Sequence, residues 1–464
     1  MRFVRYVGTE QCAAIEYQDA IQNSQDVLID RVSSAANAAV DFRLDGKPMA
    51  PDIRDSIQDF LDLGILVYLA DEMVDRARAT DYWTRTIRCL VPVNDPDLWH
   101  RNERLLTSTL SALSGDSWEF EWVRLDNSPP VRFHKRGLPD DCDVVCLFSG
   151  GVDSLLGAVQ LLDEGRKVLL VGHQAEGQSA SAQTDLAHML RTLYPDQISL
   201  VQCRVSRSPR RNTQFRLAAK TERSHRPRSF LFLTLGAAIA ARCRIDDVFM
   251  PENGFMALNI PLQKSRTGAL STRTAHPSFL LRFIQVAKEV VGFTGCIKNP
   301  FLTQSKTDML QALSTPLRPL IQRSNSCARP SRFNDRNVRH CGYCVPCIHR
   351  RIALIEAELD SSGHYAFDVF NNFSSLGRDK QQDFLAVVRF AVQVAGASTA
   401  KLQTLVFSHG HFPSDVGGKI GVAATTSYDP WVEMLRRWAA DFISKVQNKA
   451  STQTQRALGL LTRR

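Results

Sequence analysis

A strand, a glycine turn and the start of a helix follow one another in residues 143–164, and this succession constrains the fold more than any other feature. Residues 143–148 are a short apolar and β-branched run, and residues 154–164 have the composition of a helix. Backbone N–H groups at the first turn of a helix point outward and, with the helix dipole, bind anions. We therefore predict a phosphate-binding loop made of Ser149, Gly150, Gly151, Val152, Asp153 and Ser154.

Strands and helices continue to alternate after this loop. Such βαβ repetition predicts an α/β fold, a doubly wound parallel sheet of the Rossmann-like kind. Ligands of such sheets bind at the carboxyl ends of the strands, which is where the loop at Ser149 falls. The further predicted strands are 167–173, 198–205 and 246–250, and the helices between them are 181–194 and 229–242.

The length of 464 residues suits two or three domains. We expect an N-terminal α+β domain in residues 1–135, with a helix in 51–79 and strands in 83–93 and 118–125. In the second strand Trp118, Phe120 and Trp122 alternate with glutamates, which predicts a core face. We place the α/β domain in residues 136–360.

We expect a helical C-terminal extension in residues 361–464. Its clearest helices are predicted at 378–393 and 431–447, and the apolar face of the second could pack on the body or on a partner. We expect the residues after Lys449 to form a mobile tail.

The net charge of +9 comes mostly from one segment, residues 204–228, in which nine basic residues accompany a single Glu222. Such a cluster could bind phosphates of ATP, of nucleic acid or of an acidic protein, or it could be a solvated loop. The first residues do not suit a signal peptide, and the longest apolar stretch, 230–241, is too short to span a bilayer. We therefore expect a cytoplasmic protein without a membrane partner.

Four of the eleven cysteines form a pattern: Cys341, Cys344 and Cys347 are three residues apart, and Cys327 lies fourteen residues upstream of the first. Four thiolates suit a closed, structural tetrahedral zinc site, and closely spaced cysteines also suit an iron–sulfur cluster. His340 and His349 flank the three closely spaced cysteines, and either could replace Cys327 as the fourth metal ligand. The other seven are taken as ordinary thiols: Cys12, Cys89, Cys142, Cys146, Cys203, Cys243 and Cys296.

The loop at Ser149 lacks the Gly-Lys-Ser/Thr of a Walker loop and the GxGxxG of dinucleotide sites. Its six residues resemble the signature of the PP-loop ATP pyrophosphatases. That resemblance implies cleavage of ATP between the α and β phosphates, adenylation of a substrate oxygen and help from Mg²⁺. Ser305-Lys306-Thr307, after Asn299-Pro300, also resembles a recurring PP-loop segment. The implied catalytic residues are Ser149, Asp153, Ser154 and Lys306.

Taken together, the motifs of residues 140–357 resemble QueC, the 7-cyano-7-deazaguanine synthase family. The resemblance rests on the loop, on Gly177-Gln178, on Ser326-Cys327, and on the cysteine knuckle followed by Arg350. It implies ATP-dependent adenylation of a 7-deazaguanine carboxylate, with ammonia then giving an amide and a second activation giving a nitrile. It also favours structural Zn²⁺ over an iron–sulfur cluster at the four cysteines.

Two departures from this family concern the substrate and the partners. The family has a substrate segment rich in Ser-Gly-Tyr-Pro-Asp-Cys, and this chain has a different sequence in its place, which begins with residues 251–254 and ends with residues 271–277. The candidate substrate contacts in it are Asn253, Arg273, Thr274 and His276. The chain is also about twice as long as a housekeeping QueC. This arrangement resembles QueC-like proteins of bacterial anti-phage systems, such as QatC of the Qat system and the QueC-like member of CBASS operons. That implies conjugation to a partner protein from the same operon.

Two other functions remain open at this point. PP-loop enzymes also modify tRNA, and the basic segment 204–228 could hold RNA phosphates, although nucleic acid is not the favoured partner. A nucleotide-sensing scaffold without turnover is the third hypothesis. His173, at a strand end, could touch adenine, although a structural role is expected.

Overall fold

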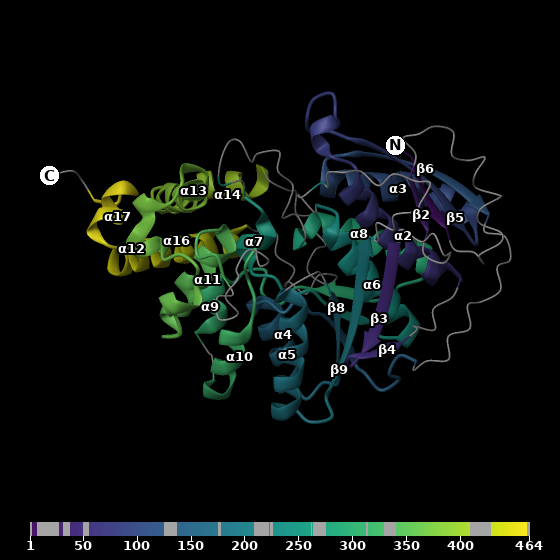
Figure 1. Ribbon diagram of the computed structural model, residues 1–464, viewed down its shortest axis with the longest axis horizontal. Helices are drawn as coiled ribbons and strands as arrows, with labels where there is room; N and C mark the ends of the chain where they lie inside the picture. The colour runs from purple at the N-terminus through teal and green to yellow at the C-terminus, as the bar shows by residue number, and fades with distance from the viewer. Residues whose placement is uncertain are drawn as a thin grey trace.

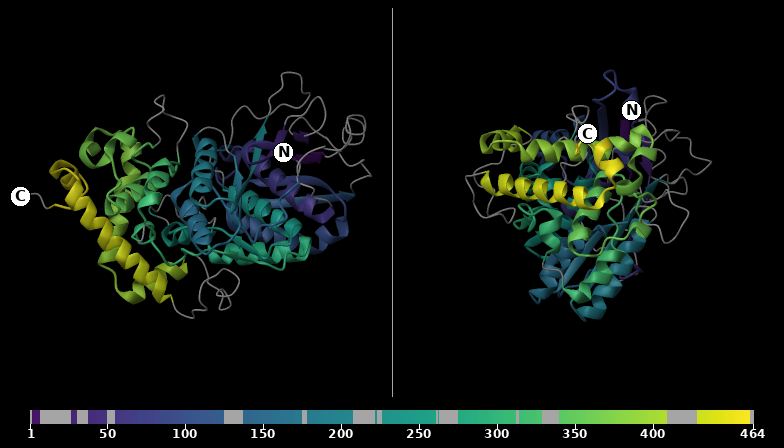
Figure 2. Two further views of the ribbon diagram at one scale, coloured as in Figure 1. Left: turned by 90° about the horizontal axis from the view of Figure 1, so that it is seen from below. Right: turned by 90° about the vertical axis from the view of Figure 1, so that its left-hand side faces the viewer.

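The computed structural model describes residues 2–6, 27–30, 38–49, 55–124, 137–174, 178–207, 222, 226–260, 262, 275–311, 314–328, 340–408 and 428–461. These residues form two β-sheets with helices packed on them, followed by a group of C-terminal helices. Figures 1 and 2 show that the C-terminal helices lie at one end of the molecule and the N-terminal sheet at the other. Within the described part of the chain, no helix combines the length and apolar character that a bilayer crossing needs.

The larger sheet has seven strands in the order β11-β10-β7-β8-β9-β3-β4. Its first five strands are parallel, and in sequence order they are β7 (Val144–Leu147), β8 (Val168–His173), β9 (Ile198–Arg207), β10 (Asp247–Phe249) and β11 (Cys296–Lys298). The chain runs outward from β7 in one direction through β8 and β9, and in the other through β10 and β11. The gap between β7 and β10 is therefore the switch point at which such sheets bind ligands. The predicted doubly wound sheet is confirmed in this part.

Alternate residues of the buried strands pack into two separate cores, because successive side chains of a strand point to opposite faces. Val145, Leu147 and Val171 face the core that contains α6 (Arg228–Cys243), α8 (Pro277–Val291) and α2 (Asp55–Met73). Residues Val144, Cys146 and Leu170 face the core of α4 (Val152–Asp163), α5 (Gln178–Leu193) and α10 (Arg318–Arg323). The sheet is thus covered on both faces.

The smaller sheet, in the order β2-β1-β5-β6, is parallel throughout and is made of β1 (Arg2–Tyr6), β2 (Val27–Asp30), β5 (Thr86–Val93) and β6 (Ser117–Arg124). Trp118, Phe120 and Trp122 of β6 are buried, which confirms the predicted core face. Trp122 stacks on Trp99 of helix α3 (Pro96–Ser114), with ring centroids 4.9 Å apart. The aromatic stripe therefore packs the sheet against α3.

A hairpin of the N-terminal segment belongs to the larger sheet. Its strand β3 (Ala38–Leu44) pairs antiparallel with β9, and β4 (Lys47–Met49) pairs with β3. Helix α2 packs beside α6, so the N-terminal segment and the α/β unit share one core. The domain division at residue 135 remains a prediction, but residues on both sides of it form a common sheet.

The C-terminal segment is helical, with α12 (Val369–Asn372), α13 (Arg378–Ala395), α14 (Thr399–Ser408), α16 (Asp429–Lys449) and α17 (Thr452–Ala457). Trp431, Leu435 and Phe442 of α16 are buried in the main core, so its apolar face packs on the body. The prediction of a mobile tail after Lys449 is wrong for residues 450–461. There the side chain of Ser451 caps α17 through the N–H of Thr454, and Leu458 is buried.

Candidate functional site

The loop after β7 has the backbone of an anion-binding turn. Gly150 has a φ of 81°, a backbone conformation that is strained for residues with a side chain. Gly151 follows in an extended conformation and is the residue before α4. The Oγ atoms of Ser149 and Ser154 lie 3.2 Å apart, and the N–H of Gly151 donates to Ser149 Oγ at 3.3 Å. The first N–H groups of α4 have no partner within the helix and are available to a phosphate.

Two neighbours hold this loop in place. The backbone N–H of Asn325 donates to the carbonyl of Gly150 at 2.8 Å. A Cβ atom on Gly150 would come within 3.1 Å of the backbone nitrogen of Gln183, in the second turn of α5. The loop is therefore packed against α5 and against the segment that leads to Cys327.

Asp153, on the first turn of α4, joins two residues that arrive from distant parts of the chain. Its carboxylate pairs with the ammonium of Lys306, and Asn253 Nδ2 donates to Asp153 Oδ2 at 2.6 Å. Burial by itself would raise the pKa of Asp153, but the charge of Lys306 and the hydrogen bonds from Asn253 lower it below its ordinary value. Asp153 is thus an anion that lies beside the buried cation of Lys306, where the phosphate loop passes into α4.

Local structure positions Lys306 at the start of helix α9 (Lys306–Leu310). Ser305 caps this helix in a reciprocal capping box with Asp308. Just upstream, Asn299 Oδ1 accepts the N–H of Phe301 at 3.1 Å, and Asn299 Nδ2 donates to the carbonyl of Glu252 at 2.9 Å. The segment that carries Lys306 is therefore tied to the segment that carries Asn253.

Two titratable groups near this pair have shifted pKa values. Burial, followed by the charge of Asp153, raises the pKa of Glu252 to about 8. Burial lowers the pKa of His349 to about 3, and the charge of Lys306 acts in the same direction. Around neutral pH the site therefore holds a neutral glutamic acid and a neutral histidine next to the Asp153–Lys306 ion pair.

The four predicted substrate contacts have different outcomes. Asn253 lies in the site, on Asp153. His276 caps helix α8 instead: it is buried, its Nδ1 accepts the N–H of Ser278 at 3.2 Å, and Nδ1 lies 2.8 Å from Ser278 Oγ. Arg273 and Thr274 lie outside the described residues. Of the two candidates that the structure describes, Asn253 therefore lies at the phosphate loop and His276 at the start of α8.

Two other sequence candidates are structural where the structure describes them. His173 is buried between the rings of Tyr68 and Phe232, at centroid distances of 5.0 and 5.8 Å. At the end of the basic segment, Arg226 lies over the ring of Trp83 at 4.3 Å and donates to the carbonyl of Ser114. Most of residues 204–228, and Gly177 of the QueC resemblance, lie outside the described residues.

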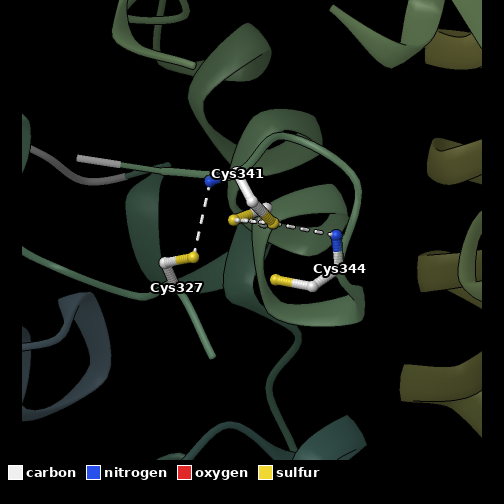
Figure 3. Close-up of side chains that lie close together, drawn as sticks. Cys327, Cys341 and Cys344 are labelled. Carbon is white, nitrogen blue, oxygen red and sulfur yellow. Dashed lines mark hydrogen bonds between the residues drawn. The ribbon is translucent and has the colours of Figure 1, made fainter. Parts of the chain in front are cut away.

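The four predicted cysteines form one buried cluster, from the segment after α10 and from the start of α11 (Val345–Glu356). Their sulfur atoms lie within 4.8 Å of one another, and those of Cys341 and Cys347 are 3.7 Å apart. Figure 3 shows the sulfur atoms of Cys327, Cys341 and Cys344 close together. Zinc–thiolate bonds of about 2.3 Å in a tetrahedron place the sulfurs about 3.8 Å apart. The cluster therefore fits a structural Zn²⁺ ion.

The flanking histidines are not part of this cluster. His340 Nε2 accepts the N–H of Ser326 at 3.3 Å, and His349 Nδ1 accepts the indole N–H of Trp438 at 3.3 Å. Arg350 is fully buried and donates to Ser324 Oγ at 2.8 Å and to the carbonyl of Ile321 at 2.7 Å. Its place after the knuckle thus reflects a structural task, which is to hold the segment before Cys327.

Sequence reasoning missed Asn325, Glu252 and His349 as neighbours of the loop and of Lys306. Asn325 directly precedes the Ser326-Cys327 pair, and Glu252 lies within the segment that replaces the family's substrate segment. The sequence therefore indicates the neighbourhood of both residues but not their roles. His349 was considered only as a metal ligand. No local signal indicates that Trp438, 89 residues away, contacts it.

Comparison with known proteins gives one match. Residues 143–358, just under half of the chain, match the family described as "Queuosine biosynthesis protein QueC". Searches of curated proteins and of solved structures returned no match. The matched part contains the loop at Ser149, Lys306 and all four clustered cysteines. Residues 143–358 are therefore a QueC-like unit, and this supports an ATP-using PP-loop enzyme of the synthase or ligase kind.

Proposed function

We propose that the chain uses ATP to adenylate a carboxylate of the 7-deazaguanine type and releases AMP and pyrophosphate. The observation that carries this proposal is the Asp153–Lys306 pair beside the phosphate loop, at the switch point of the sheet. A PP-loop next to a buried cation suits a reaction that is catalysed mostly by positioning and by neutralising phosphate charge.

In the proposed reaction, the N–H groups at the start of α4 and the hydroxyls of Ser149 and Ser154 bind the β and γ phosphates. A carboxylate oxygen of the substrate attacks the α-phosphorus, and the bond between the α-phosphorus and the bridging oxygen breaks. The electron pair stays on pyrophosphate, whose growing charge Lys306 neutralises. The carboxylate of Asp153 offers an oxygen ligand of the kind that Mg²⁺ binds, and magnesium would supply further neutralisation.

The acyl adenylate then reacts with a nitrogen nucleophile, and AMP leaves. With ammonia the product is an amide, and a second activation would give a nitrile. The replaced segment around Asn253 and the residues outside 143–358 support another acceptor, an amine on a partner protein from the same operon. The resemblance to long QueC-like proteins supports a role in bacterial anti-phage defence.

The substrate is tested by incubating the chain with ATP, Mg²⁺ and 7-carboxy-7-deazaguanine, with and without ammonium. We expect AMP only when the carboxylate is present, and ammonium should give an amide or nitrile product by mass. AMP release also excludes a scaffold without turnover. The absence of AMP under every condition would refute the substrate.

The acceptor is tested separately. The chain is co-expressed with its operon neighbours, and their intact masses are compared with those from cells that carry an Asp153→Asn variant. We expect a mass increase on one neighbour that depends on the active chain. Unmodified neighbours together with efficient nitrile synthesis by the purified protein would contradict conjugation.

A further inference from the structure

Helix α16 lies outside the QueC-like residues 143–358, yet it contacts the residue next to Lys306. The hydroxyl of Thr307 donates to Asp441 Oδ2 at 2.9 Å. Arg437, one turn earlier on α16, lies 3.4 Å from Asp308 Oδ2, the carboxylate of the capping box of α9. Helix α16 thus holds the N-terminal turn of α9 through two of its residues.

The same helix also packs on the segment that carries Asn253. Trp438 lies 4.3 Å from the ring of Phe255, and a Cβ atom on Gly254 would come within 3.1 Å of the methyl group of Met434. Asn253, Gly254 and Phe255 are consecutive. Both partners of Asp153, Lys306 and Asn253, are therefore followed directly by residues that α16 contacts.

Asp441 is itself held from the other side. The buried ammonium of Lys445 lies 2.5 Å from Asp441 Oδ1 and 2.9 Å from Glu356 Oε2, at the end of α11. One oxygen of Asp441 is thus taken by Lys445 and the other by Thr307. This arrangement fixes the direction in which Asp441 presents its second oxygen to α9.

We propose that Asp441 is a positioning residue of the ATP site, which acts through Thr307 to hold Lys306 toward the phosphate loop. Helix α9 has five residues, far fewer than the about 12–15 that an isolated helix needs to be marginally stable, so its start depends on external contacts. A lysine side chain loses much rotamer freedom when it is ordered, and a backbone that is already fixed adds no further ordering cost on nucleotide binding. The inference rests on the proposed use of ATP and extends the site beyond the QueC-like unit.

The test measures the Kd for ATP by calorimetry in the full-length chain. Thr307→Val removes the hydroxyl at nearly constant volume, and Thr307→Ser retains it. We expect Thr307→Val and Asp441→Asn to weaken ATP binding by about 10-fold or more, the lower end of the range of one hydrogen bond to a charged group, and Thr307→Ser to restore most of it. Glu433→Gln, the same loss of charge on an exposed position of α16, should bind ATP like the wild type.

A double-mutant cycle separates positioning from general stability. In a Lys306→Met background, Thr307→Val should cause no further loss of ATP binding. An equal loss in both backgrounds, or unchanged ATP binding in Thr307→Val, would overturn the proposal. If the wild type binds ATP but releases no AMP with the carboxylate, the substrate assignment fails while the cycle still decides the role of Asp441. Failure of the wild type to bind ATP refutes both.

Discussion

Asn325 connects the phosphate loop to the cysteine cluster, since its backbone N–H donates to the carbonyl of Gly150 at 2.8 Å. Its side-chain Oδ1 accepts the backbone N–H of Cys327 at 3.0 Å. Asn325 is therefore hydrogen-bonded both to Cys327, the first cysteine of the cluster, and to Gly150, the glycine of the loop with positive φ. Order in the cluster should therefore stabilise order in the loop.

Loss of the metal should weaken ATP binding. Cys344→Ser removes one of the four ligands, and we expect loss of zinc, measured by elemental analysis, together with a thermal midpoint lowered by about 5–10 °C. ATP binding should fall because Cys327 no longer fixes Asn325. Cys296→Ser, a change at a thiol outside the cluster, is the control. A zinc-free variant that binds ATP like the wild type would contradict the connection.

The positive φ of Gly150 should matter for binding beyond its effect on stability. Gly150→Ala and Gly165→Ala place alanine at φ values of 81° and 77°, each at a cost of about 1–2 kcal/mol. A new Cβ atom would meet Gln183 only at Gly150, since Gly165 has open space. Gly150→Ala should lose at least as much stability in urea unfolding as Gly165→Ala, and only Gly150→Ala should lose ATP affinity. Equal ATP affinity in the two variants would argue against a phosphate loop.

Much of the α/β unit could be predicted because its signals are local. Apolar runs, glycine turns and helical periodicity predict β7, α4, β8 and their successors within a few residues of their observed ends. The prediction omits α3, although Asp95, Pro96 and Gly115 carry the start and stop signals of that helix. It also omits the β3–β4 hairpin, for which Asp45-Gly46 between alternating apolar residues is a strong signal.

Other features could not be predicted because they depend on contacts between distant segments. The pairing of β3 with β9 joins residues about 160 positions apart, and no local pattern selects that edge. Asn253 and Lys306 were each candidates, but their meeting on Asp153 follows from the strand order of the sheet. The side chain of His276 before Pro277 is compatible with a ligand contact or a helix cap, and the cap becomes visible only once the start of α8 is known.

Replacement of Lys306 should affect chemistry more than folding. Lys306→Met leaves Asp153 without its cation, and we expect the kcat/KM for ATP in AMP release to fall on the order of 100-fold. Lys298→Met removes a partly exposed lysine that pairs with Asp247 at 2.7 Å, and it should cost less than about 1 kcal/mol of stability with little effect on turnover. Similar rates in the two variants would contradict a phosphate role for Lys306.

The proton on Glu252 should make stability depend on pH. Its pKa is about 8 in the folded chain, because of burial and the charge of Asp153, against an ordinary value of 4.5. The folded state therefore binds this proton more tightly, so the contribution to stability is fully present below about pH 4.5 and is lost as the pH rises through about 8. Glu252→Gln should flatten the decline in the free energy of unfolding between these pH values, measured in urea, and the exposed Glu289→Gln should not. A wild-type profile without this decline would show that Glu252 is ionised in the folded chain and would favour its carboxylate as a permanent charge of the site.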